Sequence, residues 1–144
     1  MAANLRNLPI LLVEDNPVDV DLTLRAFKKQ NLTNNIVVAR DGEKALQQME
    51  LWDKGQQVPV VILLDLKLPK VDGLEVLRVL KTHAVYKTIP VVVLTSSGDD
   101  RDIAEAYELG VNSYIVKPVS FDKFVDVAAQ IELYWTILNK TNMH

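Results

Sequence analysis

Five short runs of aliphatic residues, separated by segments with helical spacing, constrain the fold of this 144-residue chain most strongly. The runs are dense in Val, Ile and Leu without alternating apolar and polar residues, which is typical of strands buried on both faces of a parallel sheet. Parallel neighbours need a crossover connection, which is usually a helix. We therefore expect five strands, over Ile10 to Val13, Ile36 to Ala39, Val60 to Leu64, Val91 to Leu94 and Tyr114 to Val116.

The segments between these runs carry the signals of helices. Pro17 after Asn16 is a typical helix opening, and Gly55 and Gly110 stand where helices are expected to end. The stretch VDVDLTL, residues 18–24, alternates like a strand, but the preceding proline and the need for a crossover favour a helix. Five βα units predict a doubly wound parallel α/β domain.

Composition places the chain among globular proteins, since 49% of its residues are hydrophobic and 24% are charged. Its net charge of -3 offers no electrostatic footprint for nucleic acid or for an anionic membrane. The sequence has no cysteine, and no apolar run approaches the roughly 20 residues of a membrane span. We expect a cytoplasmic protein with one domain over residues 1–144, a core at about 8–130 and a C-terminal helix at about 120–140.

Polar side chains follow four of the five predicted strands. Glu14 and Asp15 follow the first strand, Asp65 the third, Thr95 the fourth and Lys117 the fifth. The C-terminal ends of parallel strands lie along one edge of an open sheet, where ligands bind. A carboxylate at the tip of a buried strand costs free energy unless it is paired. We therefore expect three carboxylates, a hydroxyl and an ammonium to converge in one crevice.

This set of side chains suits phosphoryl transfer with a divalent cation. Carboxylate oxygens, carbonyls and water are ligands of Mg²⁺, which often engages phosphate as well. A carboxylate beside the metal, here Asp65, is a possible nucleophile toward phosphorus. Lys117 supplies a point charge and Thr95 a hydrogen-bond donor for the phosphoryl oxygens.

Together these residues make the chain resemble the receiver domain of two-component response regulators. The resemblance rests on the acidic pair in VEDN and on the motifs LLDLKLPKVDG, VLTSS and YIVKP, and it spans roughly residues 8 to 130. It implies a five-stranded flavodoxin-like sheet of order 2-1-3-4-5. It also implies a phosphoacceptor switch rather than an enzyme, in which Asp65 accepts a phosphoryl group from a phosphohistidine on a sensor histidine kinase.

The resemblance implies roles for the remaining site residues. The carboxylates of Glu14, Asp15 and Asp65 and the backbone carbonyl of Lys67 would hold Mg²⁺. Glu14 stands where the family more often has Asp, so its contact with the metal could run through water. Lys67, two residues past Asp65, adds a positive charge near the site. The sequence does not tell whether this charge raises or lowers metal affinity or phosphoryl lifetime.

The resemblance also assigns the switch. Lys117 would pair with the phosphoryl group, the bond between Lys117 and Pro118 would be cis, and Thr95 with Tyr114 would relay the change. Tyr114 by itself could equally be a plain core aromatic. The stretch VEDNPVDVDLTLRAF and the long C-terminal segment resemble the stand-alone regulators that partner cyanobacterial phytochromes. With no effector domain expected, output would come from partner binding or dimerisation.

The C-terminal segment has more apolar residues than one sheet can cover. A first stripe falls on one helical face and is the stripe needed to cover the sheet. A second, adjacent stripe has the 4-3-4 spacing of a helix-helix seam and predicts a homodimer interface, unless the protein's own loops cover it. The first stripe consists of Phe121, Phe124, Val125, Ala128, Ile131 and Trp135, and the second of Val127, Ile131, Tyr134 and Leu138.

Each site residue also has an ordinary structural explanation. Asp65 alone would be a turn or helix-cap residue, and Glu14 and Asp15 could cap the first helix. Thr95 could be a capping hydroxyl, and Lys117 a solvated surface charge. Two other functions stay open, namely a phosphorylation-independent interaction module and a metal-dependent phosphohydrolase. The lack of a second carboxylate placed as acid or base beside Asp65 argues against the hydrolase.

Overall fold

The computed structural model describes residues 8–142, with side chains described as far as residue 133. The strands are β1 (Ile10–Val13), β2 (Ile36–Ala39), β3 (Val61–Leu64), β4 (Val91–Thr95) and β5 (Ser113–Val116). The helices are α1 (Pro17–Lys29), α2 (Gly42–Asp53), α3 (Gly73–Thr82), α4 (Asp100–Glu108) and α5 (Phe121–Asn142), with a 3-10 turn, η2, at Tyr86–Thr88. Strands β1 and β2 have the predicted bounds, and the other three differ by one residue at one end.

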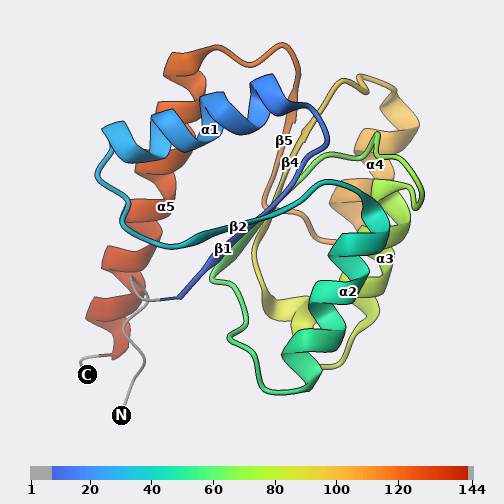
Figure 1. The fold of residues 1–144 in the computed structure, drawn as a ribbon, viewed down its shortest axis with the longest axis horizontal. Coiled ribbons are helices and arrows are strands. Elements are labelled where there is room, and N and C mark those ends of the chain that lie inside the picture. Colours follow the sequence, from blue (N-terminus) through green and yellow to red (C-terminus); the bar gives the residue numbers. More distant parts are fainter. Residues whose placement is uncertain (1–7, 143–144) are drawn as a thin grey trace.

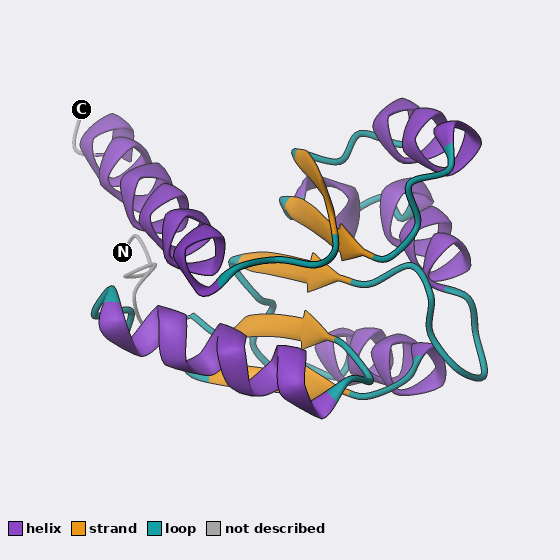
Figure 2. Cartoon of the chain, turned by 90° about the horizontal axis from the view of Figure 1, so that it is seen from above, coloured by secondary structure: helices purple, strands orange, loops and turns teal. Residues whose placement is uncertain are grey.

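All neighbouring strands pair in parallel, in the order β2-β1-β3-β4-β5, which confirms the predicted flavodoxin-like sheet. Helices α1 and α5 cover one face of the sheet, and α2, α3 and α4 cover the other (Figure 1, Figure 2). This arrangement follows from right-handed crossovers, because the chain passes from β1 to β2 and then reverses direction across the sheet to β3. The switch point between β1 and β3 therefore lies at the sheet edge where the predicted site residues gather.

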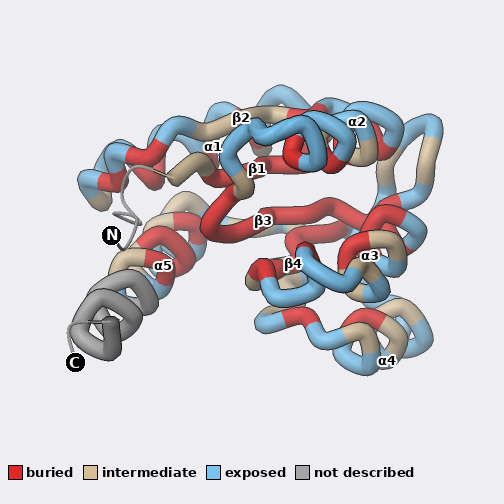
Figure 3. Tube along the Cα trace, turned by 90° about the horizontal axis from the view of Figure 1, so that it is seen from below, coloured by how far each residue is buried: buried red, intermediate tan, exposed pale blue. Residues whose placement is uncertain are grey.

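Each face of the sheet has its own hydrophobic core. Phe27 of α1 and Phe124 of α5 are buried on one face, and Trp52 of α2 and Leu77 of α3 are buried on the other. Strand β3 runs between the two cores and is buried along its whole length (Figure 3). Burial on both faces explains why this run is continuously aliphatic. It also means that the residue after β3 starts from a rigid position.

Capping residues set the helix boundaries as the sequence predicts. The side-chain oxygen of Asn16 accepts a hydrogen bond from the backbone N–H of Val18 at 2.9 Å, so the alternating stretch that follows is a helix. Gly55 and Gly110 follow the ends of α2 and α4 with φ of 101° and 96°. This left-handed conformation favours glycine and ends both helices.

Helix α5 buries two of the four residues of the predicted dimer seam. Val127 and Ile131 are only 2% and 6% exposed, because they pack with Phe27 and Phe124 in the core beneath α1 and α5. These two side chains therefore belong largely to the protein's own core, and their contact with a second chain stays a prediction. The other two members of the seam, Tyr134 and Leu138, lie outside the described side chains. Among the described residues no helix is long and apolar enough to cross a membrane.

Candidate functional site

Three carboxylates meet at the C-terminal edge of the sheet. Glu14 and Asp15 follow β1 and Asp65 follows β3, and ligand oxygens from all three lie within 4.8 Å of one another. Glu14 and Asp65 are buried, whereas Asp15 is exposed. Because β1 and β3 are neighbours in the sheet, topology alone places these strand ends side by side.

Lys117 enters the same site from the end of β5. Its ammonium lies 2.6 Å from Oε1 of Glu14, 3.1 Å from Oδ2 of Asp65 and 2.8 Å from Oδ2 of Asp19. The side chain is 14% exposed, so it is not a solvated surface charge. Burial opposes its charged form, but hydrogen bonds and ion pairs with Asp19 and Glu14 outweigh burial and raise the pKa of Lys117. The bond to Pro118 is cis, as expected.

The carboxyl of Glu14 has a raised pKa. Burial raises the pKa of its carboxyl to about 7, against the pull of Lys117 and with the help of the neighbouring Asp65 carboxylate. Oε1 accepts from Lys117, and Oε2 accepts a hydrogen bond from the backbone N–H of Asn16 at 3.2 Å. The longer side chain therefore spans from the ammonium to the start of α1.

The carboxylate of Asp65 is held by the backbone around it. Its own N–H donates to the carbonyl of Val13 at 3.0 Å, and its Oδ1 accepts from the N–H of Lys67 at 3.0 Å. The start of α3 returns so close to this strand end that a Cβ added at Gly73 would overlap the carbonyl oxygen of Asp65 and the Cα of Leu66. Asp65 is thus held by backbone contacts at the end of β3, with Oδ2 directed to the ammonium of Lys117.

The fourth strand ends in a hydrogen-bonded loop that links Thr95 to Tyr114. The hydroxyl of Thr95, which is fully buried, accepts from the backbone N–H of Ser97 at 3.3 Å. The phenol of Tyr114 donates to the carbonyl of Ser97 at 2.7 Å. Tyr114 is half-buried and makes a specific contact with the loop before α4, so it is more than a core aromatic. The two predicted switch residues touch the same residue from opposite sides.

The side chain of Lys67 pairs with α4 and not with the carboxylate cluster. Its ammonium is 3.6 Å from Oδ2 of Asp102 on α4, and that carboxylate also accepts a hydrogen bond from the hydroxyl of Ser97 at 2.6 Å. The chain of contacts joins the loop after Asp65 to the loop before α4. The role of the Lys67 carbonyl as a metal ligand stays a prediction.

Sequence reasoning missed two contributors to this region, Asp19 and Asp102. Both are acids in the first turn of a helix that starts at the functional edge of the sheet. In sequence such acids look like ordinary partners of a helix N-terminus. The one signal in the sequence was that Asp19 and Asp102 closely follow strands that end in polar residues.

The donor set fits a hard divalent cation. All three clustered ligands, Glu14, Asp15 and Asp65, are carboxylates, and the ammonium of Lys117 pairs with two of them and with Asp19. Oxygen-only ligands with one exposed member suit a cation that keeps part of its water shell. Because acids outnumber the ammonium, the site repels an anion such as phosphate unless a bound cation offsets the negative charge.

Comparison with known proteins decides the family. Residues 10–129 match the response regulator receiver domain. The chain belongs to this family. Receiver domains of response regulators are phosphoacceptor switches rather than true enzymes. The match spans every strand and helix except the last part of α5.

Similar proteins come from different signalling systems. The chain is 44% identical over 133 residues to the probable methanogenesis regulatory protein FilR2 of Methanothrix harundinacea, covering 92% of this receiver and 86% of FilR2. The phosphorylated cyanobacterial phytochrome response regulator RcpA has 37% identity and a TM-score of 0.79, with 90% and 94% of the two chains covered. The Mn²⁺-bound response regulator Rcp1, known from Synechocystis, has 39% identity and a TM-score of 0.75, with 89% and 94% covered.

Proposed function

We propose that this receiver accepts a phosphoryl group on Asp65 from a phosphohistidine of a sensor histidine kinase, with Mg²⁺ as cofactor. The observation that carries the proposal is the placement of one fixed carboxylate, at the end of β3, between a carboxylate cluster and a buried ammonium. Glu14, Asp15, Asp65 and the backbone carbonyl of Lys67 would hold the cation. RcpA, which is described as phosphorylated, and Rcp1, which is described as Mn²⁺-bound, support this assignment.

The chain's own residues divide the work of the transfer. An oxygen of Asp65 forms the bond to phosphorus as the bond between phosphorus and the kinase imidazole nitrogen breaks. Bound Mg²⁺ would neutralise charge on the phosphoryl oxygens and on the attacking carboxylate. Lys117, already 3.1 Å from Asp65, is placed to pair with a phosphoryl oxygen. The fixed backbone of Asp65 keeps its carboxylate in line for attack.

Thr95 and Tyr114 would carry the change away from the site. In the present state the Thr95 hydroxyl accepts from the N–H of Ser97. A phosphoryl group on Asp65 offers Thr95 a strong acceptor, so its hydroxyl would turn to donate there. The loop at Ser97 would follow, and with it the phenol of Tyr114, which donates to the Ser97 carbonyl. Asp102 connects the same loop to α4.

A phytochrome-class histidine kinase in the cytoplasm is the partner that the similarity to RcpA favours. RcpA is described as a phytochrome response regulator, and it is similar to this chain in fold and sequence over most of its length. FilR2, described as a probable methanogenesis regulator, is at least as similar in sequence and points to a different kinase. Phosphotransfer rates from a panel of purified kinases distinguish these partners, since a cognate kinase phosphorylates its receiver much faster than the others do.

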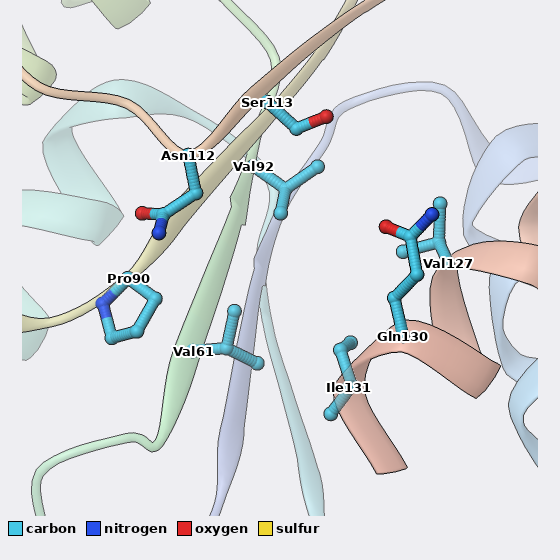
Figure 4. A pocket seen from close by; sticks show the side chains of 8 residues that line it. All are labelled: Val61, Pro90, Val92, Asn112, Ser113, Val127, Gln130 and Ile131. Atoms are coloured by element: carbon cyan, nitrogen blue, oxygen red, sulfur yellow. The ribbon is translucent and has the colours of Figure 1, made fainter. Parts of the chain in front are cut away.

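Homodimerisation through the distal part of α5 is the output that we propose. Leu133 is 60% exposed, and α5 continues to Asn142 and runs away from the strands (Figure 2). Where α5 leaves the sheet it opens a cavity of about 160 Å³, in which Val127 and Ile131 face Val61 and Val92 (Figure 4). An apolar side chain from a second copy would fill this space.

The dimer and the phosphorylation site are tested separately. Truncation after Leu133 should give a monomer that still accepts phosphate, measured by sedimentation velocity and by intact mass. A full-length chain that sediments as a monomer at tens of micromolar, with and without phosphorylation, would exclude the dimer but not the transfer.

Phosphorylation is tested with acetyl phosphate and Mg²⁺. The wild type should gain one phosphoryl group by intact mass, and Asp65→Asn should gain none. Asp72→Asn is the matched control, because Asp72 caps α3 nearby through the N–H of Leu74 and lies outside the carboxylate cluster. Failure of the wild type to be modified by acetyl phosphate or by any kinase would favour a phosphorylation-independent interaction module.

A further inference from the structure

Asp19 reaches the acidic site from a helix rather than from a strand end. It is the third residue of α1, and its Oδ2 lies 2.8 Å from the ammonium of Lys117. Its side chain is 19% exposed, so this ion pair is partly shielded from water. The same ammonium contacts Glu14 and Asp65, which makes Asp19 the third carboxylate around one cation.

The start of α1 leaves the Asp19 carboxylate available for Lys117. An acid at this position of a helix often accepts a hydrogen bond from the backbone N–H of the N-cap residue. Here the N–H of the N-cap residue, Asn16, donates instead to Oε2 of Glu14 at 3.2 Å. Glu14 thus accepts the hydrogen bond that an acid in the first turn of the helix would otherwise accept. The contact of Asp19 with the site therefore follows from the local structure of the β1–α1 connection.

Binding of a divalent cation would take carboxylate partners away from Lys117. The ammonium of Lys117 is paired with Glu14 and Asp65, which are also two of the three clustered cation ligands. A divalent cation therefore competes with Lys117 for the same two carboxylates. An ammonium that loses its partners inside a protein carries a large desolvation cost. Asp19 does not belong to the cluster, so its oxygen stays free to hold Lys117.

We propose that Asp19 is a positioning residue for Lys117, which keeps the ammonium paired when Glu14 and Asp65 turn to a divalent cation. The inference rests on the proposed function, because it presupposes a cation site. With Asp19 in place, Lys117 gives up two contacts and retains one. The ammonium stays at the rim of the site, where a phosphoryl group on Asp65 meets it. Asp19 thereby lowers the cost of cation binding and prepares Lys117 for phosphate.

A double-mutant cycle on Mg²⁺ binding tests this role. Calorimetric titration with Mg²⁺ is done on the wild type, Asp19→Asn, Lys117→Ala and the double variant. Asp19→Asn should weaken Mg²⁺ binding by roughly threefold or more, because Lys117 then holds Glu14 and Asp65 more strongly. In the Lys117→Ala background the same substitution should have a clearly smaller effect, since only its long-range field is lost.

Matched variants separate the ion pair from charge and from folding. Asp21→Asn removes the same charge from the same helix, but Asp21 is exposed and pairs with Arg25 at 3.0 Å, so its effect on Mg²⁺ binding should be small. Asp19→Glu restores the charge and should recover most of the affinity. Asp19→Ser, which suits a first helical turn, replaces Asp19→Asn if that variant does not unfold cooperatively in EDTA.

The outcomes distinguish this inference from the function on which it rests. Equal weakening by Asp19→Asn in both backgrounds, or equal weakening by Asp21→Asn, overturns the positioning role while the cation site stands. A wild type that binds no Mg²⁺ overturns the proposed cation site and this inference with it. Weakening that depends on Lys117 and is reversed by Asp19→Glu supports the positioning role.

Discussion

Glu14 should make the metal-free protein less stable as pH rises. Its buried carboxyl has a pKa of about 7 in the folded state, against 4.5 as the ordinary value for the unfolded chain. Burial is the main cause, and the ion pair with Lys117 opposes it without overcoming it. A folded-state pKa that is raised adds stability below the unfolded value, and that stability is lost as pH rises through the folded value. The loss therefore falls between pH 4.5 and about 7.

The magnitude follows from the two pKa values. Each pH unit between them corresponds to about 1.4 kcal/mol, so the loss amounts to about 3 kcal/mol of unfolding free energy. Glu14→Gln keeps a neutral side chain of similar shape and removes this loss. The variant should match the wild type below about pH 4.5 and exceed it by up to about 3 kcal/mol above about pH 7.

Urea unfolding in EDTA, followed by the fluorescence of the buried Trp52, measures both proteins across this range. The affinity for Mg²⁺ should change with pH in the opposite direction, because a proton on Glu14 competes with the cation. It should rise as the pH increases toward about 7 in the wild type, and it should not rise in Glu14→Gln. Unfolding free energies that run in parallel with pH for the two proteins would refute the reasoning. A wild type that gains stability relative to the variant on going from about pH 5 to 8 would refute it too.

The structure predicts two further effects on stability. Gly73→Ala should destabilise the protein by about 1–3 kcal/mol, because the new Cβ overlaps the carbonyl of Asp65 and the Cα of Leu66; denaturant unfolding measures it, and an unchanged midpoint would contradict the close approach. Tyr114→Phe should cost about 1 kcal/mol, because the carbonyl of Ser97 loses its phenol donor, and labelling with acetyl phosphate should be retained. Complete loss of labelling in Tyr114→Phe would mean that the phenol acts in the transfer itself.

The sequence predicts the fold well because the strands of a doubly wound sheet have a strong signal. The run at β3 is continuously aliphatic because it is buried on both faces, and Asn16 and Gly110 mark helix ends by chemistry that is local in the chain. The boundaries that differ, such as the start of β5 at Ser113, depend on pairing with β4. Pairing is a property of two strands, so one strand's composition does not contain it.

The site was less completely predictable, for a physical reason. Strand ends such as Asp65 and Lys117 converge by topology, so their proximity follows once the sheet order is known. Asp19 reaches Lys117 only because Glu14 occupies the N–H of Asn16, which is a matter of side-chain geometry. The burial of Ile131 depends on how α5 packs against α1, and helical spacing alone does not distinguish a core stripe from a dimer seam.

Phosphotransfer from a kinase, mapped to a single residue, tests most directly whether Asp65 is the phosphoacceptor. A purified sensor histidine kinase, phosphorylated on its histidine, is mixed with this receiver and Mg²⁺, and the acyl phosphate is trapped by borohydride reduction before peptide mass spectrometry. We expect one modified residue, Asp65, loss of the modification in Asp65→Asn, and loss of transfer when Mg²⁺ is chelated. Modification at another carboxylate of the site, such as Asp15, or undiminished labelling of Asp65→Asn, would contradict it.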